Sequence, residues 1–319
     1  MQKKLITVFG ATGAQGGGLV RAILNDASDE FAVRAVTRDI HSSKAQQLVR
    51  LGAQVVAGDL DDPASIRRAM AGAYGAYCVT FFWEHYSPEK EDTQARNMAQ
   101  AAKDAGLKHV IWSTLEDSRK WIPLTDNRMP TLMGKYKVPH LDGKGGANHY
   151  FSDLKVPTTF LLTSFYWENF IYFGMGPKPG PDGKLAISFP LGNSKLSGIA
   201  AEDIGKCALG VFKKGKALIG KTVGIAGEQL TGQQMADAMT KVFGLPIAYN
   251  EITPEQYRNL GFPGADDLGN MFQFQRDFAE DCLKARNLAF SRELNPELQT
   301  FKEWLIKNGQ RIPVEQLVS

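Results

Sequence analysis

The chain has 319 residues, of which 43% are hydrophobic and 22% are charged. This composition is close to that of an average soluble globular protein, and a chain of this length buries most of its apolar surface without disulfides. Disordered, collagen-like and disulfide-scaffold classes are therefore excluded. The 37 basic and 34 acidic residues leave a net charge of only +3. That charge is too small for nucleic-acid binding driven by charge alone, so we expect no direct contact with nucleic acid.

Three cysteines, Cys78, Cys207 and Cys282, lie far apart in the sequence. Their odd number and wide spacing predict neither a disulfide framework nor a zinc site, and a reducing compartment is the simpler interpretation. The apolar residues 5–9 are too few for a signal peptide, and no stretch reaches the roughly 18 apolar residues of a membrane-spanning helix. We therefore expect a protein of the cytoplasm, or of cytoplasm and nucleus, without membrane association or a bound metal.

The first half of the chain alternates short β-branched runs with longer helical patterns. Strands are expected at residues 5–9, 32–37, 54–57, 76–80, 109–113 and 158–163. Helices fill the gaps: one starts after Asp62 and Pro63, and another runs from about residue 87 to residue 105 and ends at Gly106. Strands separated by helices of this length imply right-handed crossovers and a parallel sheet. The predicted fold class is α/β, a Rossmann-like doubly wound parallel sheet.

The regular alternation of strands and helices ends after about residue 165. Residues 174–183 form a loop by composition, because they are rich in glycine and proline. Short strands (185–189, 222–225, 247–251) then mix with helices (about 202–212, 232–243 and 302–307). We expect a Rossmann-like domain at residues 1–165 and a smaller C-terminal α/β domain at residues 166–319. The boundary is soft, since strands of the second half can join an edge of the main sheet.

The sharpest motif is the glycine loop at residues 10–16, Gly-Ala-Thr-Gly-Ala-Gln-Gly, which lies between the first strand and the first helix. Glycines at such a site allow a tight turn, a close approach to a pyrophosphate and close helix–strand packing. The helix N-terminus then offers free N–H groups to the phosphates. The motif predicts dinucleotide binding, although its Gly-x-x-Gly-x-x-Gly spacing departs from the simplest fingerprint. The alternative is a glycine-rich turn that binds nothing.

The residue after the second strand indicates which dinucleotide is bound. An NAD-preferring site usually has Asp or Glu there to bind the ribose 2′-OH, whereas this chain has Arg38, with His41 and Lys44 close behind. A guanidinium can bind a 2′-phosphate through forked, charge-assisted hydrogen bonds. We therefore expect NADP(H). The alternative is a solvated arginine, which would give little preference between the two cofactors.

Two further segments follow strand ends, where ligands of open α/β sheets bind. Asp59, after the third strand, either faces an adenine or caps the next helix, and the two roles are compatible. Thr80, Phe81 and Phe82, after the fourth strand, either flank a nicotinamide or pack beneath a loop. The aromatic residues between 165 and 173 leave a similar choice between core packing and a pocket wall.

Together these motifs resemble the NmrA-like family, atypical members of the short-chain dehydrogenase/reductase superfamily. The residues that carry the resemblance are 10–16, 36–38, 58–59, 141–145 (Leu-Asp-Gly-Lys-Gly) and 166–169 (Tyr-Trp-Glu-Asn). The similarity covers essentially the whole chain and is greatest to the HSCARG-type proteins. It implies a Rossmann-like NADP-binding domain with a small C-terminal domain. It also implies a redox-sensing regulator of transcription that acts through protein partners, with a homodimer as one possible assembly.

The resemblance also implies roles for individual residues. Gly10, Thr12, Gly13, Ala14, Gln15 and Gly16 would lie at the phosphates, Arg38 at the 2′-phosphate, and Asp59 and Leu60 near the adenine. The nicotinamide half would be surrounded by Thr80, Phe81, Phe82, Lys144, Tyr166, Trp167, Glu168 and Asn169. One departure is visible, because the family's second lysine is replaced near Thr93, with Lys90 one turn earlier.

The sequence offers alternatives for chemistry beyond binding. Typical short-chain reductases use a Tyr-x-x-x-Lys pair with an upstream serine. Here Lys144 is the obvious lysine, but His140 stands in the place of the tyrosine, and Ser113 is the candidate serine. Either His140 acts as a general acid or Lys144 acts alone. The simpler alternative is that Lys144 only holds the cofactor and His140 is structural.

The leading hypothesis from the sequence is therefore an NADP(H)-sensing regulatory protein without catalytic activity. The alternative is an NADPH-dependent reductase of a carbonyl or quinone-like small molecule. A third class, a repressor that binds DNA directly, is disfavoured by the small net charge and by the lack of a helix-turn-helix signal.

Overall fold

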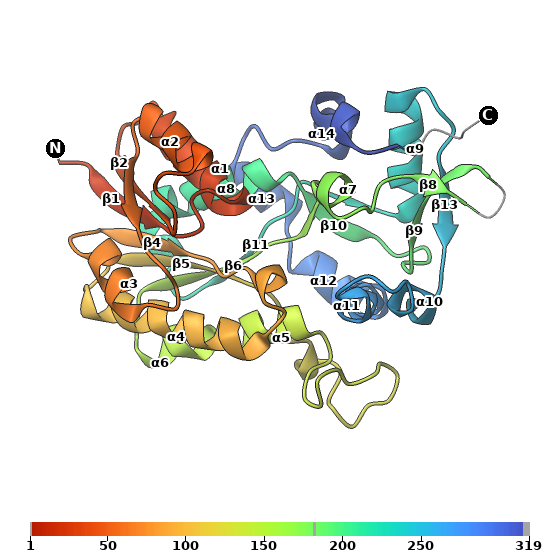
Figure 1. The fold of residues 1–319 in the computed structure, drawn as a ribbon, viewed down its shortest axis with the longest axis horizontal. Helices are drawn as coiled ribbons and strands as arrows, with labels where there is room; N and C mark the ends of the chain where they lie inside the picture. The colour runs from red at the N-terminus through yellow and green to blue at the C-terminus, as the bar shows by residue number, and fades with distance from the viewer. Residues whose placement is uncertain (1, 181–182, 315–319) are drawn as a thin grey trace.

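Seven parallel strands form the main sheet of the computed structural model, which describes residues 2–180 and 183–314 (Figure 1). In spatial order these strands are β3 (Gln54–Ala57), β2 (Phe31–Thr37), β1 (Lys4–Val8), β4 (Gly75–Cys78), β5 (His109–Thr114), β6 (Thr158–Leu162) and β11 (Thr222–Gly224). The strand order reverses between β1 and β4, which is the switch point of a Rossmann-like sheet. The predicted fold class is confirmed, and each of the six strands expected in the first half is present.

Helices cover both faces of the main sheet (Figure 1). One face carries α1 (Ala14–Leu24), α2 (Ser43–Arg50), α8 (Ala201–Lys214) and α13 (Leu288–Leu294). The other carries α3 (Pro63–Met70), α4 (Pro88–Asp104), α5 (Pro139–Gly146) and α6 (Asn148–Asp153). Each face has its own apolar core: Ile6 and Phe212 belong to the first, and Trp112 and Met98 to the second. Because both faces are covered, β5 is buried along its whole length.

The remaining elements form a smaller unit beside the main sheet. Its strands are β7 (Phe165–Tyr166), β10 (Leu196–Ile199) and β12 (Glu228–Leu230) in one sheet, and β8 (Lys178–Pro179), β9 (Leu185–Phe189) and β13 (Ala248–Glu251) in another. Its helices are α7 (Asn169–Tyr172), α9 (Gly232–Phe243), α10 (Pro254–Arg258), α11 (Ala265–Asp277), α12 (Ala279–Lys284) and α14 (Phe301–Asn308). An aromatic core that includes Phe189, Phe272 and Trp304 holds the unit together.

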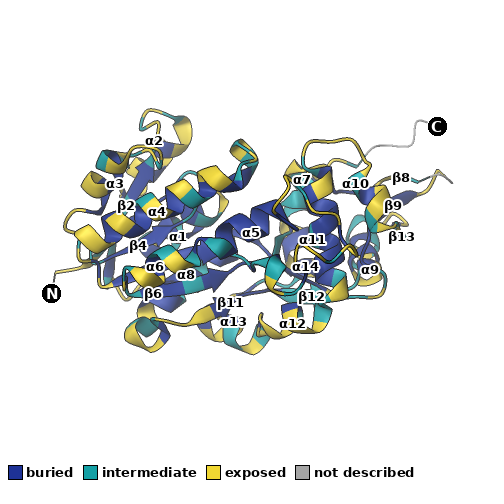
Figure 2. Ribbon diagram, turned by 90° about the horizontal axis from the view of Figure 1, so that it is seen from below, coloured by how far each residue is buried: buried dark blue, intermediate teal, exposed yellow. Residues whose placement is uncertain are grey.

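The two units are joined along buried helices and by shared elements. Figure 2 shows α5 and α11 largely buried where the units meet. Although β11 and α8 follow residue 165, they belong to the layers of the main sheet. The contact between α8 and α1 is especially close, because a Cβ on Gly205 would lie 2.1 Å from the backbone nitrogen of Leu19. The second half of the chain therefore fixes the helix that begins at the glycine loop.

One expectation about local structure is wrong. Residues 174–183 were expected to be a loop throughout, but Lys178 and Pro179 form β8 and pair antiparallel with Ala186 and Leu185 of β9. The composition of residues 174–183 did not indicate a strand, because β8 depends on its pairing with β9. Residues 181–182 lie outside the described residues. No helix within the described ranges is both long enough and apolar enough to span a membrane.

Candidate functional site

A cleft of about 880 Å³ lies at the carboxyl ends of the strands of the main sheet and reaches into the smaller unit. The predicted site residues that line it are Gly10, Thr12, Gly13, Ala14, Gln15, Gly16, Arg38, Asp59, Leu60, Thr80, Phe81, Phe82, His140, Lys144, Tyr166, Glu168 and Asn169. Two predicted residues, Ser113 and Trp167, do not line the cleft. The fold therefore brings residues of both units to one continuous site, where an open α/β sheet binds ligands.

The glycine loop has the shape that a phosphate site requires. Gly10 adopts a φ of +62°, which favours glycine. At Gly16 a Cβ would lie 2.4 Å from the carbonyl oxygen of Gly10, so a side chain there would collide with the turn. Helix α1 begins after Gly13 without a side-chain cap. Its first amide groups are therefore free to bind an anion beside the positive end of the helix dipole.

The side chain of Gln15 ties this turn to three strands. Its Oε1 accepts hydrogen bonds from Ser113 Oγ at 2.7 Å and from the hydroxyl of Tyr77, and its Nε2 donates to the hydroxyl of Tyr166. Burial raises the pKa of Tyr166 to about 12, so this hydroxyl stays neutral. Ser113 is 2% exposed and faces Gln15 rather than the cleft, so its role is to hold the turn.

Arg38 lines the cleft, and it has a partner that the sequence did not indicate. Its Nη1 donates to Oε1 of Glu84 at 2.5 Å, from the short helix η1 (Phe82–Glu84) after β4. The hydrogen bond and charge of Glu84 raise the pKa of Arg38. Both side chains are exposed, and exposed ion pairs contribute only about 0–1 kcal/mol. A 2′-phosphate can therefore replace Glu84 at the guanidinium.

The loop after β3 supplies the next part of the wall. The Asp59 carboxylate accepts from the amide of Asp61 at 2.9 Å and closes a turn, while the cap of α3 is Asp62. The expected capping role thus belongs to Asp62. Lys90 lines the cleft and its Nζ lies 2.9 Å from Asp61, whereas Thr93 donates its hydroxyl hydrogen to the backbone within α4.

Lys144 is buried and already fully bonded within the protein. Its Nζ donates to Glu91 Oε1 at 2.8 Å and to both the carbonyl and the hydroxyl oxygen of Thr80. These three bonds use all the hydrogens of the ammonium group. Glu91 is completely buried, and its Oε2 has no partner among the described residues. These bonds suit a residue that fixes the end of β4 at the cleft. Because all three hydrogens are already used, they disfavour Lys144 as the only general acid.

His140 has the partner that an acid–base histidine requires. Its Nδ1 lies 2.6 Å from Oδ1 of Asp267, at the start of α11, and its backbone amide donates to the other carboxylate oxygen. The ring lies against Trp83 and Phe82, with centroid distances of 5.0 and 5.9 Å. A carboxylate at Nδ1 fixes the orientation of the ring and leaves Nε2 for a second partner. The sequence did not reveal Asp267, which is 127 residues away.

Of the residues that follow β7, some line the cleft and others belong to the core of the smaller unit. Trp167 is 1% exposed and packs on Phe301 and Trp304 in the smaller unit, so its predicted place at the nicotinamide is not what the structure shows. The resemblance implied that place for the whole segment 166–169, whereas the side chain of Trp167 is turned into the core of the smaller unit. Glu168 accepts from the amide of Ala201 at 2.8 Å and from Nε1 of Trp304 at 2.9 Å. Burial raises the pKa of this carboxyl group.

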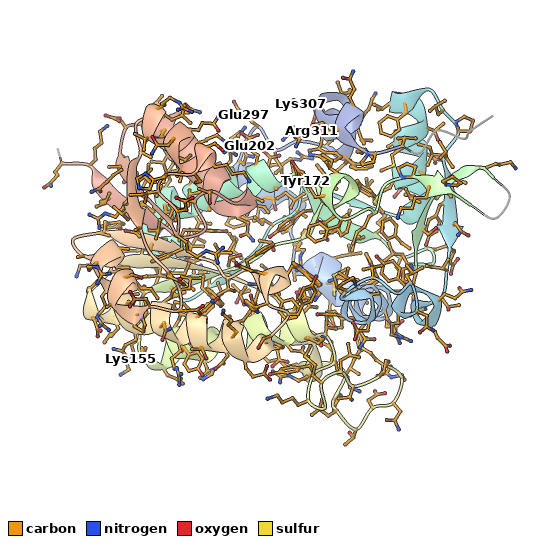
Figure 3. All side chains as sticks on the ribbon, in the orientation of Figure 1. Lys155, Tyr172, Glu202, Glu297, Lys307 and Arg311 are labelled. Carbon is orange, nitrogen blue, oxygen red and sulfur yellow. The ribbon has the colours of Figure 1, made fainter. Side chains whose placement is uncertain are left out.

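Aromatic side chains of the same segment also form part of the wall. Those that line the cleft are Phe165, Tyr166, Tyr172 and Phe173. Figure 3 shows Tyr172 beside Arg311, whose guanidinium donates to the tyrosine hydroxyl and lies 5.6 Å from its ring centre. Some aromatic residues of this cluster therefore pack in the core and others line the pocket. The sequence could not distinguish these two roles.

We call the part of the cleft that is lined mainly by the smaller unit the inner compartment. Its wall comes from β7, β10, α11 and neighbouring segments, and consists of Leu115, Phe165, Leu196, Ser197, Leu268, Met271, Gln275 and Arg286. Most of these side chains are apolar. Sequence patterns did not indicate Leu196, Ser197 or Arg286 as pocket residues, since their segments are brought here only by the tertiary fold.

Known proteins share this architecture. The model of the NmrA-like family matches residues 2–305. An NmrA-like family domain-containing protein of Dictyostelium discoideum is 30% identical over 81% of this chain and 83% of its own length. An NmrA-like family domain-containing oxidoreductase of Penicillium ochrochloron is 27% identical over 96% of this chain and 98% of its own length. The crystal structure of NmrA, a negative transcriptional regulator, in complex with NADP has a TM-score of 0.76 at 22% identity, with 96% of this chain and 95% of NmrA covered. These matches confirm the resemblance of the motifs, and the chain belongs to the NmrA-like family.

Proposed function

We propose that the protein binds NADP(H) in the cleft and uses it to reduce a small organic molecule in the inner compartment. The glycine turn and the free amides of α1 suit a pyrophosphate, and Arg38 suits a 2′-phosphate. A relative named as an oxidoreductase, matched over nearly its whole length, supports this reductase function.

The observation that carries the proposal is the position of the His140–Asp267 pair. His140 lines the same cleft as the predicted nicotinamide residues and the inner compartment, and it stands four residues before Lys144 on α5. The reductase function was the alternative at the sequence level, and this pair together with the inner compartment favours it over the regulator.

The chemistry needs one hydride and one proton. When bound, the reduced nicotinamide supplies the hydride to an electrophilic carbon. His140 gives the proton on Nε2 to the oxygen that gains negative charge, Asp267 holds the ring in the orientation for this transfer, and solvent restores the proton afterwards. Lys144 and Thr80 hold the end of β4 in place. The products are the oxidised cofactor and the reduced, hydroxyl-bearing molecule.

The test is NADPH oxidation by the purified protein with uncharged quinones, aldehydes and ketones. We expect turnover with at least one class, and we expect His140→Gln to lower kcat by about 100-fold or more, the usual effect of losing a general acid. His149→Gln is the matched control, because His149 is exposed and lies outside the cleft. Absence of NADPH oxidation across the panel would remove the proposal, as would equal activity of the His140 and His149 variants.

A second candidate, an NADP(H)-sensing regulator of the HSCARG type, is favoured by the Arg38–Glu84 pair. A 2′-phosphate that replaces Glu84 frees the end of η1, and the neighbouring Trp83 packs close to Gly264 at the start of α11. Cofactor binding is thereby linked to a contact between the two units, which a switch requires. Such a regulator would act in the cytoplasm or nucleus through protein partners or a homodimer.

This second candidate predicts that saturating NADPH changes the oligomer distribution in light scattering, and that NADH at the same concentration changes it less. Glu84→Gln should show part of the change without cofactor, because the ion pair is already broken. An identical distribution in all conditions would argue against a switch of assembly.

A further inference from the structure

Ser197, on β10, is a buried hydroxyl without a partner. It is 2% exposed and its Oγ has no hydrogen bond among the described residues, yet it lines the cleft at the inner compartment. The neighbouring Ser164, which also lines the cleft, donates to the carbonyl oxygen of Ile225 at 2.6 Å. A buried polar group left unsatisfied destabilises a protein, so an unpaired hydroxyl in a pocket wall indicates a ligand atom as its partner.

The charge in the wall of the inner compartment is compensated. Arg286 donates to both oxygens of Glu116, at 2.5 and 3.0 Å, and also to the carbonyl oxygens of Thr163 and Cys282. Burial would raise the pKa of Glu116, but the charge and hydrogen bonds of Arg286 hold it below its usual value. Both groups are therefore ionised, and the bidentate pair presents no net charge to a ligand.

Apart from the amide of Gln275, the remaining wall is apolar. Phe165, Leu196, Leu268 and Met271 supply ring, aliphatic and thioether groups, which favour flat, apolar molecules. An anion placed here would lose its hydration without gaining a free cation. The ligand class must therefore combine an apolar body, no net charge and one oxygen that can bond to Ser197.

We propose that the inner compartment binds an uncharged, planar, largely apolar carbonyl compound whose oxygen accepts a hydrogen bond from Ser197 Oγ. This inference rests on the proposed function, since it names the substrate class of the same site. Ser197 is a substrate-binding residue in this scheme, separate from the dinucleotide half of the cleft.

The test measures binding without turnover, in the complex of the full chain with NADP⁺. Menadione is the uncharged probe, and 1,4-naphthoquinone-2-sulfonate has the same ring system with a negative charge. We expect calorimetry to show menadione bound at least tenfold more tightly than the sulfonate. Ser197→Ala should weaken menadione binding by about three- to tenfold, the usual effect of one neutral hydrogen bond, and should leave the affinity for NADP⁺ unchanged.

Ser188→Ala is the matched control, because Ser188 lies on β9 outside the cleft. Ser197→Cys keeps the size of the side chain with a weaker donor, and it replaces Ser197→Ala if the alanine variant does not fold. The proposal is overturned if menadione does not bind, if the sulfonate binds equally well, or if the Ser197 variants weaken NADP⁺ binding instead. Menadione binding that depends on Ser197, without NADPH oxidation, would remove the reductase function while leaving this site.

Discussion

Arg38→Ala is expected to weaken NADPH binding by about 10- to 100-fold while the affinity for NADH stays the same. Hydrogen bonds to a charged group contribute about 1.5–3 kcal/mol, and only NADPH has the 2′-phosphate that Arg38 would bind. Arg38 lines the cleft and is largely exposed, so its removal should leave the fold intact. Calorimetry with both cofactors measures the difference directly.

The companion variant Glu84→Gln should act in the opposite direction. Removing its carboxylate frees the guanidinium of Arg38 before NADPH arrives, so NADPH binding should tighten by up to about fivefold, the range for an exposed ion pair. An equal loss of NADPH and NADH affinity in Arg38→Ala would contradict the assignment, because it would show that Arg38 supports the cleft generally.

Glu116→Gln is expected to lower the free energy of unfolding by about 3–5 kcal/mol. The change leaves the charge of Arg286 buried without its partner, which is the costly way to break a buried ion pair. Arg286 and Glu116 are 2% and 7% exposed, so water compensates little of the lost contact. Urea denaturation followed by circular dichroism measures the loss, provided that the transition is two-state.

Two controls separate this effect from a general sensitivity of the chain. The double variant Glu116→Gln/Arg286→Met should regain much of the stability, since it removes both charges. Glu297→Gln breaks an exposed pair with Lys206 and should change stability by less than about 1 kcal/mol. A single Glu116 variant as stable as the wild type would show that the charge of Arg286 is satisfied by other groups.

The sequence was sufficient to predict the parallel sheet, the glycine turn and the position of Arg38, because their signals are local. Periodicity distinguishes strands from helices within about ten residues, and the glycine turn is defined by its immediate neighbours. Arg38 follows β2 directly, so its place at the sheet edge follows from the topology.

The partners of the site residues could not be predicted, because they meet only in the tertiary structure. Asp267 reaches His140, Glu91 reaches Lys144 and Glu116 reaches Arg286 from distant segments. The same limit explains Ser113, which has the right strand position for a catalytic serine but bonds to Gln15 instead.

The convergence of Tyr77, Ser113 and Tyr166 on Gln15 has a kinetic consequence. A diphosphate-binding segment held at several points keeps its conformation when no coenzyme is bound, so it loses little conformational entropy on binding. We therefore expect binding and release of NADP(H) to need no local unfolding of the glycine turn.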